Sequence, residues 1–347
     1  MTDPIRDIHL GPPADCARPR LFPSLREGST LDPRTFPTPE KCPSLTPPQE
    51  ILFLAGEEPG LAETLARLAL AAGHHPTLIL PRERPLPQGV ACLVADRDQG
   101  DFPRLVHPLL RRDDHTPRFS LTVDCAGTCP RHARQDLEVL ALPGTHLAFL
   151  SQDLVYLPQE RDFPTRQQET PCCDDKTPRW GMLREAELQF LQSPACPDGP
   201  HWTILRLSLL LGLEGALDDF PPFHRREKAL REGEPIPLPS GGHWLVQPLA
   251  VADLSRILLS LPLAHEARNV VLDCAGPQRL EFRQLCQMAA RLWGQEARFQ
   301  EIPLEEVLAG HPECAPYLCH RLYPLPWPYA GLPAPRLTPL EALKELP

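Results

Sequence analysis

Two short stretches of the sequence carry side chains at a spacing typical of a catalytic site. Trp180 and Arg184 are four residues apart in a segment of helical character, so they share one face of the predicted helix. An indole offers only an N–H donor and a guanidinium stays charged, so neither exchanges a proton near neutral pH. Upstream, Gln152 offers an amide, Asp153 a carboxylate and Tyr156 a phenol. Only the last two side chains have the chemistry of an acid or a base.

A third stretch has the features of a phosphate-binding turn. The apolar residues 51–54 predict a strand buried on both faces, and an apolar helical periodicity starts at residue 61. Gly56 lies between them, where a glycine lets the backbone approach a phosphate resting on the helix N-terminus. An ordinary acidic helix start explains the same stretch, because Glu57 and Glu58 favour the positive end of the helix dipole.

Strands and helices are predicted to alternate up to about residue 210. Further strands are expected over residues 77–80, 91–95, 121–125, 147–150 and 203–207, and helices over 104–112, 134–142 and 180–192. This alternation predicts an α/β fold with a Rossmann-like, doubly wound parallel sheet. Beyond it, helices at 251–261 and 280–292 flank a strand at 269–272, which predicts a smaller C-terminal α/β lobe.

The composition divides the 347 residues into three predicted parts. Residues 1–48 are rich in proline and show no apolar periodicity, so we expect them to be mostly disordered. Residues 49–210 form the predicted Rossmann-like domain. Residues 211–347 form the predicted substrate-binding lobe, interleaved with the first domain.

The net charge and the cysteines indicate which partners, cellular location and metal sites to expect. A net charge of −10 argues against a nucleic-acid partner, and no apolar run reaches the length of a membrane span. Twelve cysteines without a signal peptide predict a reduced, cytoplasmic protein. We expect no metal site, because one dense cluster matches no common zinc spacing: His311, Cys314, Cys319 and His320.

Taken together, these segments resemble the extended short-chain dehydrogenase/reductase family. Within it, the nearest branches are the sugar-nucleotide epimerases, the dehydratases and the dTDP-4-dehydrorhamnose reductases. The resemblance covers about residues 50–345 and rests on the order and spacing of four segments: 51–80, 123–127, 147–156 and 180–187. It implies an NAD(P)-binding protein whose small-molecule partner is a nucleotide-sugar, and a possible homodimer.

The chain departs from the catalytic pattern of that family. The family's Tyr-x-x-x-Lys pair falls on Trp180 and Arg184, and its serine or threonine falls on Gln152. Because all three positions are substituted together, the resemblance implies impaired catalysis. Tyr156 and Asp153 are the possible substitutes for the missing acid.

The cofactor loop departs from the pattern as well. The family's three loop glycines fall on Gly56, Pro59 and Ala62, and Pro59 has no N–H to offer a phosphate. We therefore expect dinucleotide binding to be weakened or lost. Arg82 and Arg84 follow the second strand, where arginines suit the 2′-phosphate of NADP rather than the ribose of NAD.

The cofactor-binding residues have alternative explanations. Asp96 falls where the family contacts adenine, although a simple turn explains this residue equally well. Arg82 and Arg84 are equally well explained as solvated loop residues.

Three functions stay open. The first is a nucleotide-binding protein without turnover, with a regulatory or scaffolding role. The second is an active NAD(P)-dependent epimerase, dehydratase or reductase with displaced catalytic groups. The third is a structural partner that binds no small ligand.

Overall fold

The computed structural model describes six stretches of one compact unit that spans residues 44–347. The described residues are 47–58, 60–156, 179–193, 199–213, 226–310 and 331–344. Residues 1–46 of the predicted disordered segment lie outside them, as do Pro59 and the cluster from His311 to His320.

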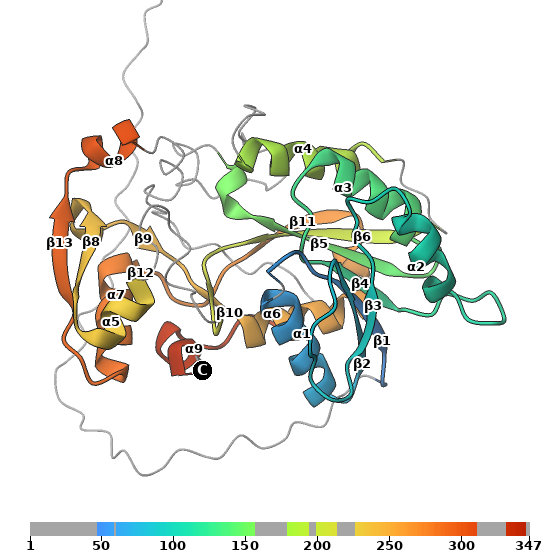
Figure 1. Ribbon diagram of the computed structural model, residues 1–347, viewed down its shortest axis with the longest axis horizontal. Helices are drawn as coiled ribbons and strands as arrows, with labels where there is room; N and C mark the ends of the chain where they lie inside the picture. Colours follow the sequence, from blue (N-terminus) through green and yellow to red (C-terminus); the bar gives the residue numbers. More distant parts are fainter. Residues whose placement is uncertain are drawn as a thin grey trace, which may run out of the picture. The chain divides into compact units, whose positions relative to one another are not determined.

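A seven-stranded parallel sheet is the centre of the fold (Figure 1). Its strand order is β11-β6-β5-β4-β1-β2-β3, and each neighbouring pair is parallel. The strands are β1 (Glu50–Leu54), β2 (His75–Leu80), β3 (Ala91–Val94), β4 (Leu121–Asp124), β5 (His146–Gln152), β6 (His201–Leu207) and β11 (Val270–Cys274). The order reverses between β1 and β4, which opens a crevice at the carboxyl ends of these strands. The predicted doubly wound Rossmann-like sheet is confirmed.

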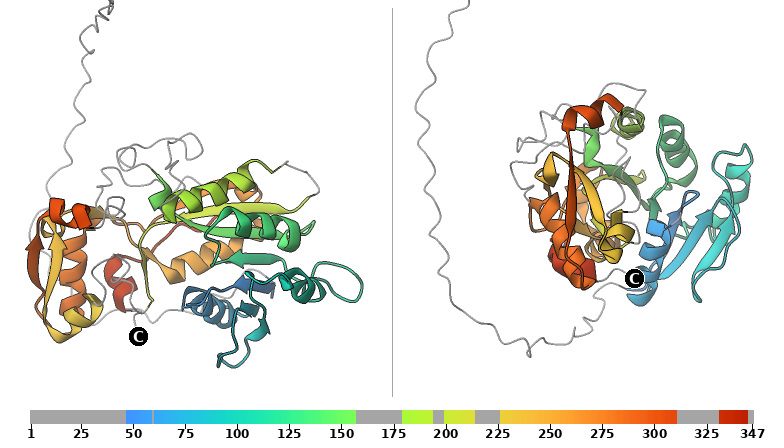
Figure 2. Two further views of the ribbon diagram at one scale, coloured as in Figure 1. Left: turned by 45° about the horizontal axis from the view of Figure 1, so that its top comes forward. Right: turned by 60° about the vertical axis from the view of Figure 1, so that its left-hand side comes forward.

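Helices cover both faces of this sheet (Figures 1 and 2). One face carries α1 (Gly60–Ala71) and α6 (Val251–Ser260), and the other carries α2 (Phe102–Leu110), α3 (Pro130–Gln135) and α4 (Arg179–Leu191). Side chains alternate between the two cores because successive strand residues point to opposite faces. Phe53 packs in the core under α1 and α6, while Leu52 and Leu54 pack under α2.

The third helix differs from its predicted range of 134–142. It begins at Pro130, which suits the first turn because a proline there loses no helical hydrogen bond. It then continues as a π-helical turn, Asp136–Leu140. The wider turn carries Asp136, whose side chain is fully buried.

The C-terminal residues form a second, smaller core. Strand β8 (Pro235–Pro239) pairs in parallel with β13 (Arg298–Ile302), and α5 (Arg226–Glu232) and α7 (Phe282–Leu292) pack beside them. Trp244 stacks on Phe282 with ring centroids 5.1 Å apart. The remaining elements are the strand pairs β7 (Leu210–Leu211) with β10 (Leu249–Ala250) and β9 (Leu245–Val246) with β12 (Leu280–Glu281), and the helices α8 (Leu304–Gly310) and α9 (Pro339–Lys344).

The two cores interleave along the chain. Helix α6 and strand β11 lie between segments of the smaller core in sequence, yet α6 packs on the large sheet and β11 is part of it. In the described stretches, no helix combines the length and apolar character that a membrane crossing needs.

Candidate functional site

A cavity of about 310 Å³ opens at the carboxyl ends of β1, β2, β3 and β4, where the strand order reverses. Its apolar lining consists of Leu54, Ala55, Ile79, Pro81, Ala95, Phe102 and Ala126. Its polar lining consists of Glu57, Asp96, Arg97, Asp98, Thr128 and His132. Switch-point crevices of this kind are the usual ligand sites of open α/β sheets.

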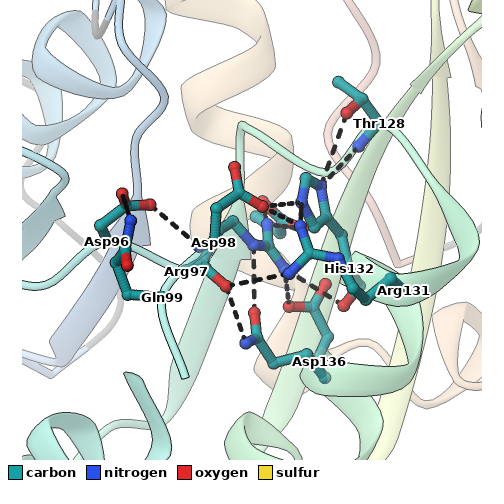
Figure 3. Close-up of polar contacts among 10 residues, drawn as sticks. Asp96, Arg97, Asp98, Gln99, Thr128, Arg131, His132 and Asp136 are labelled. Carbon is teal, nitrogen blue, oxygen red and sulfur yellow. Dashed lines mark hydrogen bonds and ion pairs between the residues drawn. The ribbon is translucent and has the colours of Figure 1, made fainter. Parts of the chain in front are cut away.

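Arg97 is the centre of a buried network beside this cavity (Figure 3). Its Nη1 donates to both carboxylate oxygens of Asp124, at 2.9 and 2.8 Å. Its Nη2 donates to Asp136 Oδ1 at 2.7 Å and to the carbonyl oxygen of His132 at 3.1 Å. Its Nε donates to Gln135 Oε1 at 3.2 Å. All three nitrogens of the Arg97 guanidinium therefore donate within the protein.

The two carboxyl groups around Arg97 are fully buried and differ in charge. Burial raises the pKa of Asp136 well above its usual value, and the neighbouring Asp124 raises it further. Burial also opposes ionisation of Asp124, but the charge and hydrogen bonds of Arg97 outweigh it and lower the pKa. Asp124 therefore carries the charge that balances Arg97, while Asp136 favours its protonated form.

His132 lines the cavity, and its neutral imidazole form is favoured there. Figure 3 shows its polar contacts. The backbone N–H of Thr128 donates to its Nδ1 at 3.3 Å, so Nε2 carries the hydrogen and faces Asp98 Oδ1 at 3.1 Å. Asp98 also pairs with Arg131. Burial lowers the pKa of His132 to about 4, and the nearby charges of Arg97 and Arg131 act in the same direction.

The residues predicted for the phosphate loop divide between the cavity and the core. Gly56 lines the cavity, and a Cβ added there would meet Ala126 Cβ at an ordinary 3.6 Å. Packing alone therefore does not require a glycine at this position. Ala62 is buried in the core under α1, and Pro59 lies outside the described residues.

The predicted NADP-binding arginines both have carboxylate partners. Arg82 Nη2 lies 3.1 Å from Glu57 Oε1, and both side chains are largely exposed, at 80% and 63%. Arg84 Nε lies 2.9 Å from Glu63 Oε1. These pairs link the loop after β2 to the start of α1.

Asp96 lines the cavity as expected for a ligand contact, yet its carboxylate is used in a turn. Its Oδ1 accepts the N–H of Asp98 at 2.9 Å, and its Oδ2 accepts from Gln99 Nε2 at 3.2 Å. Asp96 therefore forms the turn that the sequence allowed, and the predicted adenine contact stays a prediction.

The end of β5 presents two neighbouring residues to opposite faces of the sheet. Ser151 is buried toward α4 and donates to Glu187 Oε1 at 2.6 Å. Gln152, the residue predicted to replace a catalytic hydroxyl, has a buried Oε1 without a hydrogen-bond partner among the described residues. An amide oxygen accepts a hydrogen bond and supplies no proton.

Arg184 belongs to a buried ion cluster centred on Glu187. Arg184 Nη1 donates to Glu187 Oε2 at 2.8 Å, and Arg206 donates to both carboxylate oxygens, at 3.0 and 2.6 Å. Burial opposes ionisation of Glu187, but Arg206, Ser151 and Arg184 outweigh it and lower the pKa. Trp180 is the second residue of α4, and its side chain lies outside the described part of the structure.

The two proposed substitute acids lie in different surroundings. Tyr156 is buried and donates its phenol to Asp273, at 2.9 and 3.1 Å from the two carboxylate oxygens. Burial and the charge of Asp273 raise its pKa well above the usual value for tyrosine. Arg206 lies 4.5 Å above its ring. Asp153 begins a single 3₁₀ turn, Asp153–Val155, and does not line the cavity.

Sequence reasoning missed the charged residues that organise both networks: Arg97, Asp124, Asp136, Glu187, Arg206 and Asp273. Three of them carry a signal that the sequence itself contains. Arg206 interrupts the apolar run of β6, Asp124 ends that of β4, and Asp273 interrupts that of β11. A charged residue in a buried strand needs a buried partner.

The fold is shared with solved structures of low sequence identity. An epimerase from Methanothermobacter thermautotrophicus is 12% identical, with a TM-score of 0.64 over 86% of this chain and 90% of that one. A UDP-glucose 4-epimerase from Thermotoga maritima, solved with UDP-glucose, is 15% identical, with a TM-score of 0.61 over 85% and 96%. A dTDP-glucose 4,6-dehydratase from Bacillus anthracis, solved with NAD, is 13% identical, with a TM-score of 0.61 over 86% and 94%.

In sequence, by contrast, no protein-family model matches the chain, and no curated protein matches it. At these identities the structural likeness shows the fold. The chain therefore has the fold of these epimerases and dehydratases.

Proposed function

We propose that this chain is a catalytically impaired, nucleotide-binding protein of the extended short-chain dehydrogenase/reductase type, with a regulatory or scaffolding role. One observation carries the proposal. The side chains at and near the family's catalytic positions are engaged in buried polar contacts, Arg184 with Glu187 and Tyr156 with Asp273. Hydride transfer to a sugar carbonyl also needs a group that exchanges a proton, and neither Gln152 nor Arg184 does so near neutral pH.

The residues at the cavity fit only one part of a dinucleotide. Apolar walls and carboxylate rims suit a flat base and its ribose hydroxyls, so the adenosine part is matched. The diphosphate part is not matched, because the charge of Arg97 is balanced by the buried Asp124 and because Glu57 and Asp98 are acidic. We therefore propose that a dinucleotide binds weakly and derive no catalytic step through it.

Of the two dinucleotides, we propose that NADP is preferred. Arg82 follows Pro81, which lines the cavity. Its pair with Glu57 is solvent-exposed, and such pairs contribute about 0–1 kcal/mol, so Arg82 can turn to a 2′-phosphate at little cost. The nucleotide-sugar held by the Thermotoga maritima enzyme supports such a molecule as the second ligand.

Isothermal titration calorimetry of the full chain with NADP, NAD and UDP-glucose tests the binding. Thr128 is exposed and lines the cavity, so Thr128→Trp is expected to obstruct its mouth without disturbing the core. Asp113→Trp, at an exposed position away from the cavity, is the matched control. Binding that Thr128→Trp abolishes and Asp113→Trp preserves supports the proposal. If the full chain binds none of the three ligands, the structural-partner alternative is favoured.

A further inference from the structure

The cavity at the carboxyl ends of β1–β4 carries an unusual charge distribution for a nucleotide site. We propose that it takes an unphosphorylated adenine nucleoside at least as tightly as ADP or a dinucleotide, because the site repels the diphosphate. This inference rests on the proposed nucleotide binding and specifies which part of the ligand supplies the affinity.

The size and walls of the cavity match a nucleoside. Its volume of about 310 Å³ is at the lower end of the range of about 300–1,000 Å³ for small-molecule pockets. Leu54, Ile79 and Phe102 line it, and they provide the apolar contacts that suit a base. The carboxylates of Asp96 and Asp98 are acceptors that suit the donors of a nucleoside, its hydroxyl and amine groups.

The cavity offers no free positive charge for a phosphate. Among the described residues that line it, Arg97 is the one arginine or lysine, and all three of its guanidinium nitrogens donate within the protein. Moving Arg97 to a ligand would leave the buried carboxylate of Asp124 without its counter-charge, which is strongly unfavourable. His132 is neutral near pH 7 and supplies no charge either.

Negative charge lies where a diphosphate would approach. Glu57 and Glu58 precede α1, the helix whose N-terminus would otherwise attract an anion. Asp96 and Asp98 add two carboxylates after the end of β3, of which Asp98 is paired with Arg131 outside the cavity lining. Arg82, which pairs with Glu57, does not line the cavity, so its charge offsets Glu57 on the solvent side. Phosphate oxygens are acceptors and carry charge, so they gain no hydrogen bond from these groups and are repelled.

Calorimetric titration of the full chain with adenosine, ADP and NAD tests this inference, at about 50 and about 300 mM NaCl. A repelled phosphate binds more tightly when salt screens the repulsion. We expect the dissociation constant of adenosine to be equal to or lower than that of ADP at both salt concentrations. ADP affinity should rise roughly twofold or more at the higher salt, because the Debye length shortens, while adenosine affinity stays unchanged.

A charge variant and its matched control distinguish repulsion of the ADP phosphates by Glu57 from the loss of any carboxylate near α1. Glu57→Gln should strengthen ADP binding severalfold and leave adenosine binding unchanged. Glu63→Gln removes a carboxylate of α1 that pairs with Arg84 and does not line the cavity, so it should change neither.

The outcomes that contradict the two proposals differ. If ADP or NAD binds at least about tenfold more tightly than adenosine and loses affinity with added salt, as a cationic phosphate site does, the inference is overturned while nucleotide binding stands. If adenosine, ADP and NAD all fail to bind, the proposed nucleotide binding fails and the inference falls with it.

Discussion

The phenol of Tyr156 donates a hydrogen bond to the carboxylate of Asp273, 117 residues later in the chain. It links the residue after β5 and its 3₁₀ turn to β11, two strands away in the sheet, while Arg206 of the intervening β6 packs over the ring. The hydrogen bond of this phenol therefore stabilises the edge of the sheet formed by β11. Its high pKa removes it from acid–base work near neutral pH.

We predict that Tyr156→Phe lowers the stability of the fold and leaves ligand binding intact. The change leaves the buried Asp273 carboxylate without one of its donors, which costs on the order of 1–3 kcal/mol. Urea unfolding measures the loss. An active protein whose turnover disappears in Tyr156→Phe without a change in stability would instead support the displaced-acid alternative.

Substitution of Glu187 should lower the free energy of unfolding more than most substitutions in the sheet layer. Glu187→Gln removes the charge that balances Arg206 and Arg184, and breaking such a buried pair costs roughly 3–5 kcal/mol. Ser151→Ala is the comparison, because it removes one neutral donor to the same carboxylate and should cost about 1 kcal/mol. Equal losses in the two variants would show that the ion cluster does not stabilise the fold in the way described.

The two carboxyl groups around Arg97 should respond differently to the same substitution. Asp124→Asn removes the charged partner and should cost on the order of 3 kcal/mol at pH 7. Asp136→Asn replaces a carboxyl that favours its protonated form and should cost less than about 1 kcal/mol. Denaturant midpoints of the two variants give the comparison, and an equal or larger loss in Asp136→Asn would contradict the assignment of charge.

Acid should destabilise the protein through the buried His146. Burial lowers the pKa of His146 to about 3, and the charges of His201 and Arg268 lower it further. The unfolded chain takes up this proton near pH 6.5, so between about pH 6.5 and pH 3 it binds more protons than the folded state. Unfolding free energy therefore falls as the pH falls, by on the order of 3 kcal/mol from this residue at about pH 4.

His146→Gln tests this contribution, because an amide can still donate to Thr203 Oγ1 but does not titrate. The free energy of unfolding of the variant, measured from pH 7 to pH 4, should fall less steeply than that of the natural chain. If the free energies of unfolding of the two proteins fall equally steeply with pH, His146 does not contribute to the acid sensitivity.

The alternation of apolar strands with helices was enough to predict the parallel sheet, because strands buried on both faces have a continuous apolar run. The sequence was less informative about the smaller core. Its strand β13 has exposed and half-buried residues, and β8 contains three prolines, so neither shows a strand pattern. These two strands are positioned by contacts with each other and with α7 rather than by local preference.

Two of the predicted site residues line the cavity for a similar reason. Gly56 and Asp96 lie at the ends of predicted strands, and parallel strands bring their carboxyl ends to one edge. The partners of Arg97 and Glu187 come from distant parts of the chain, and a single sequence gives no measure of which charges meet. Tyr156 illustrates the limit, because its chemistry is consistent with catalysis until Asp273 is seen beside it.

The most direct test of the central claim, loss of hydride transfer, follows the absorbance of reduced nicotinamide during incubation of the protein with NADPH and nucleotide-sugars. Mass spectrometry of the sugar products accompanies it. We predict no turnover by the natural chain or by any single reversion, because the three catalytic groups act as a unit. Weak turnover is expected at most in the triple variant Gln152→Thr, Trp180→Tyr, Arg184→Lys. Steady turnover by the natural chain, lost on mutation of Tyr156 or Asp153, would contradict the account.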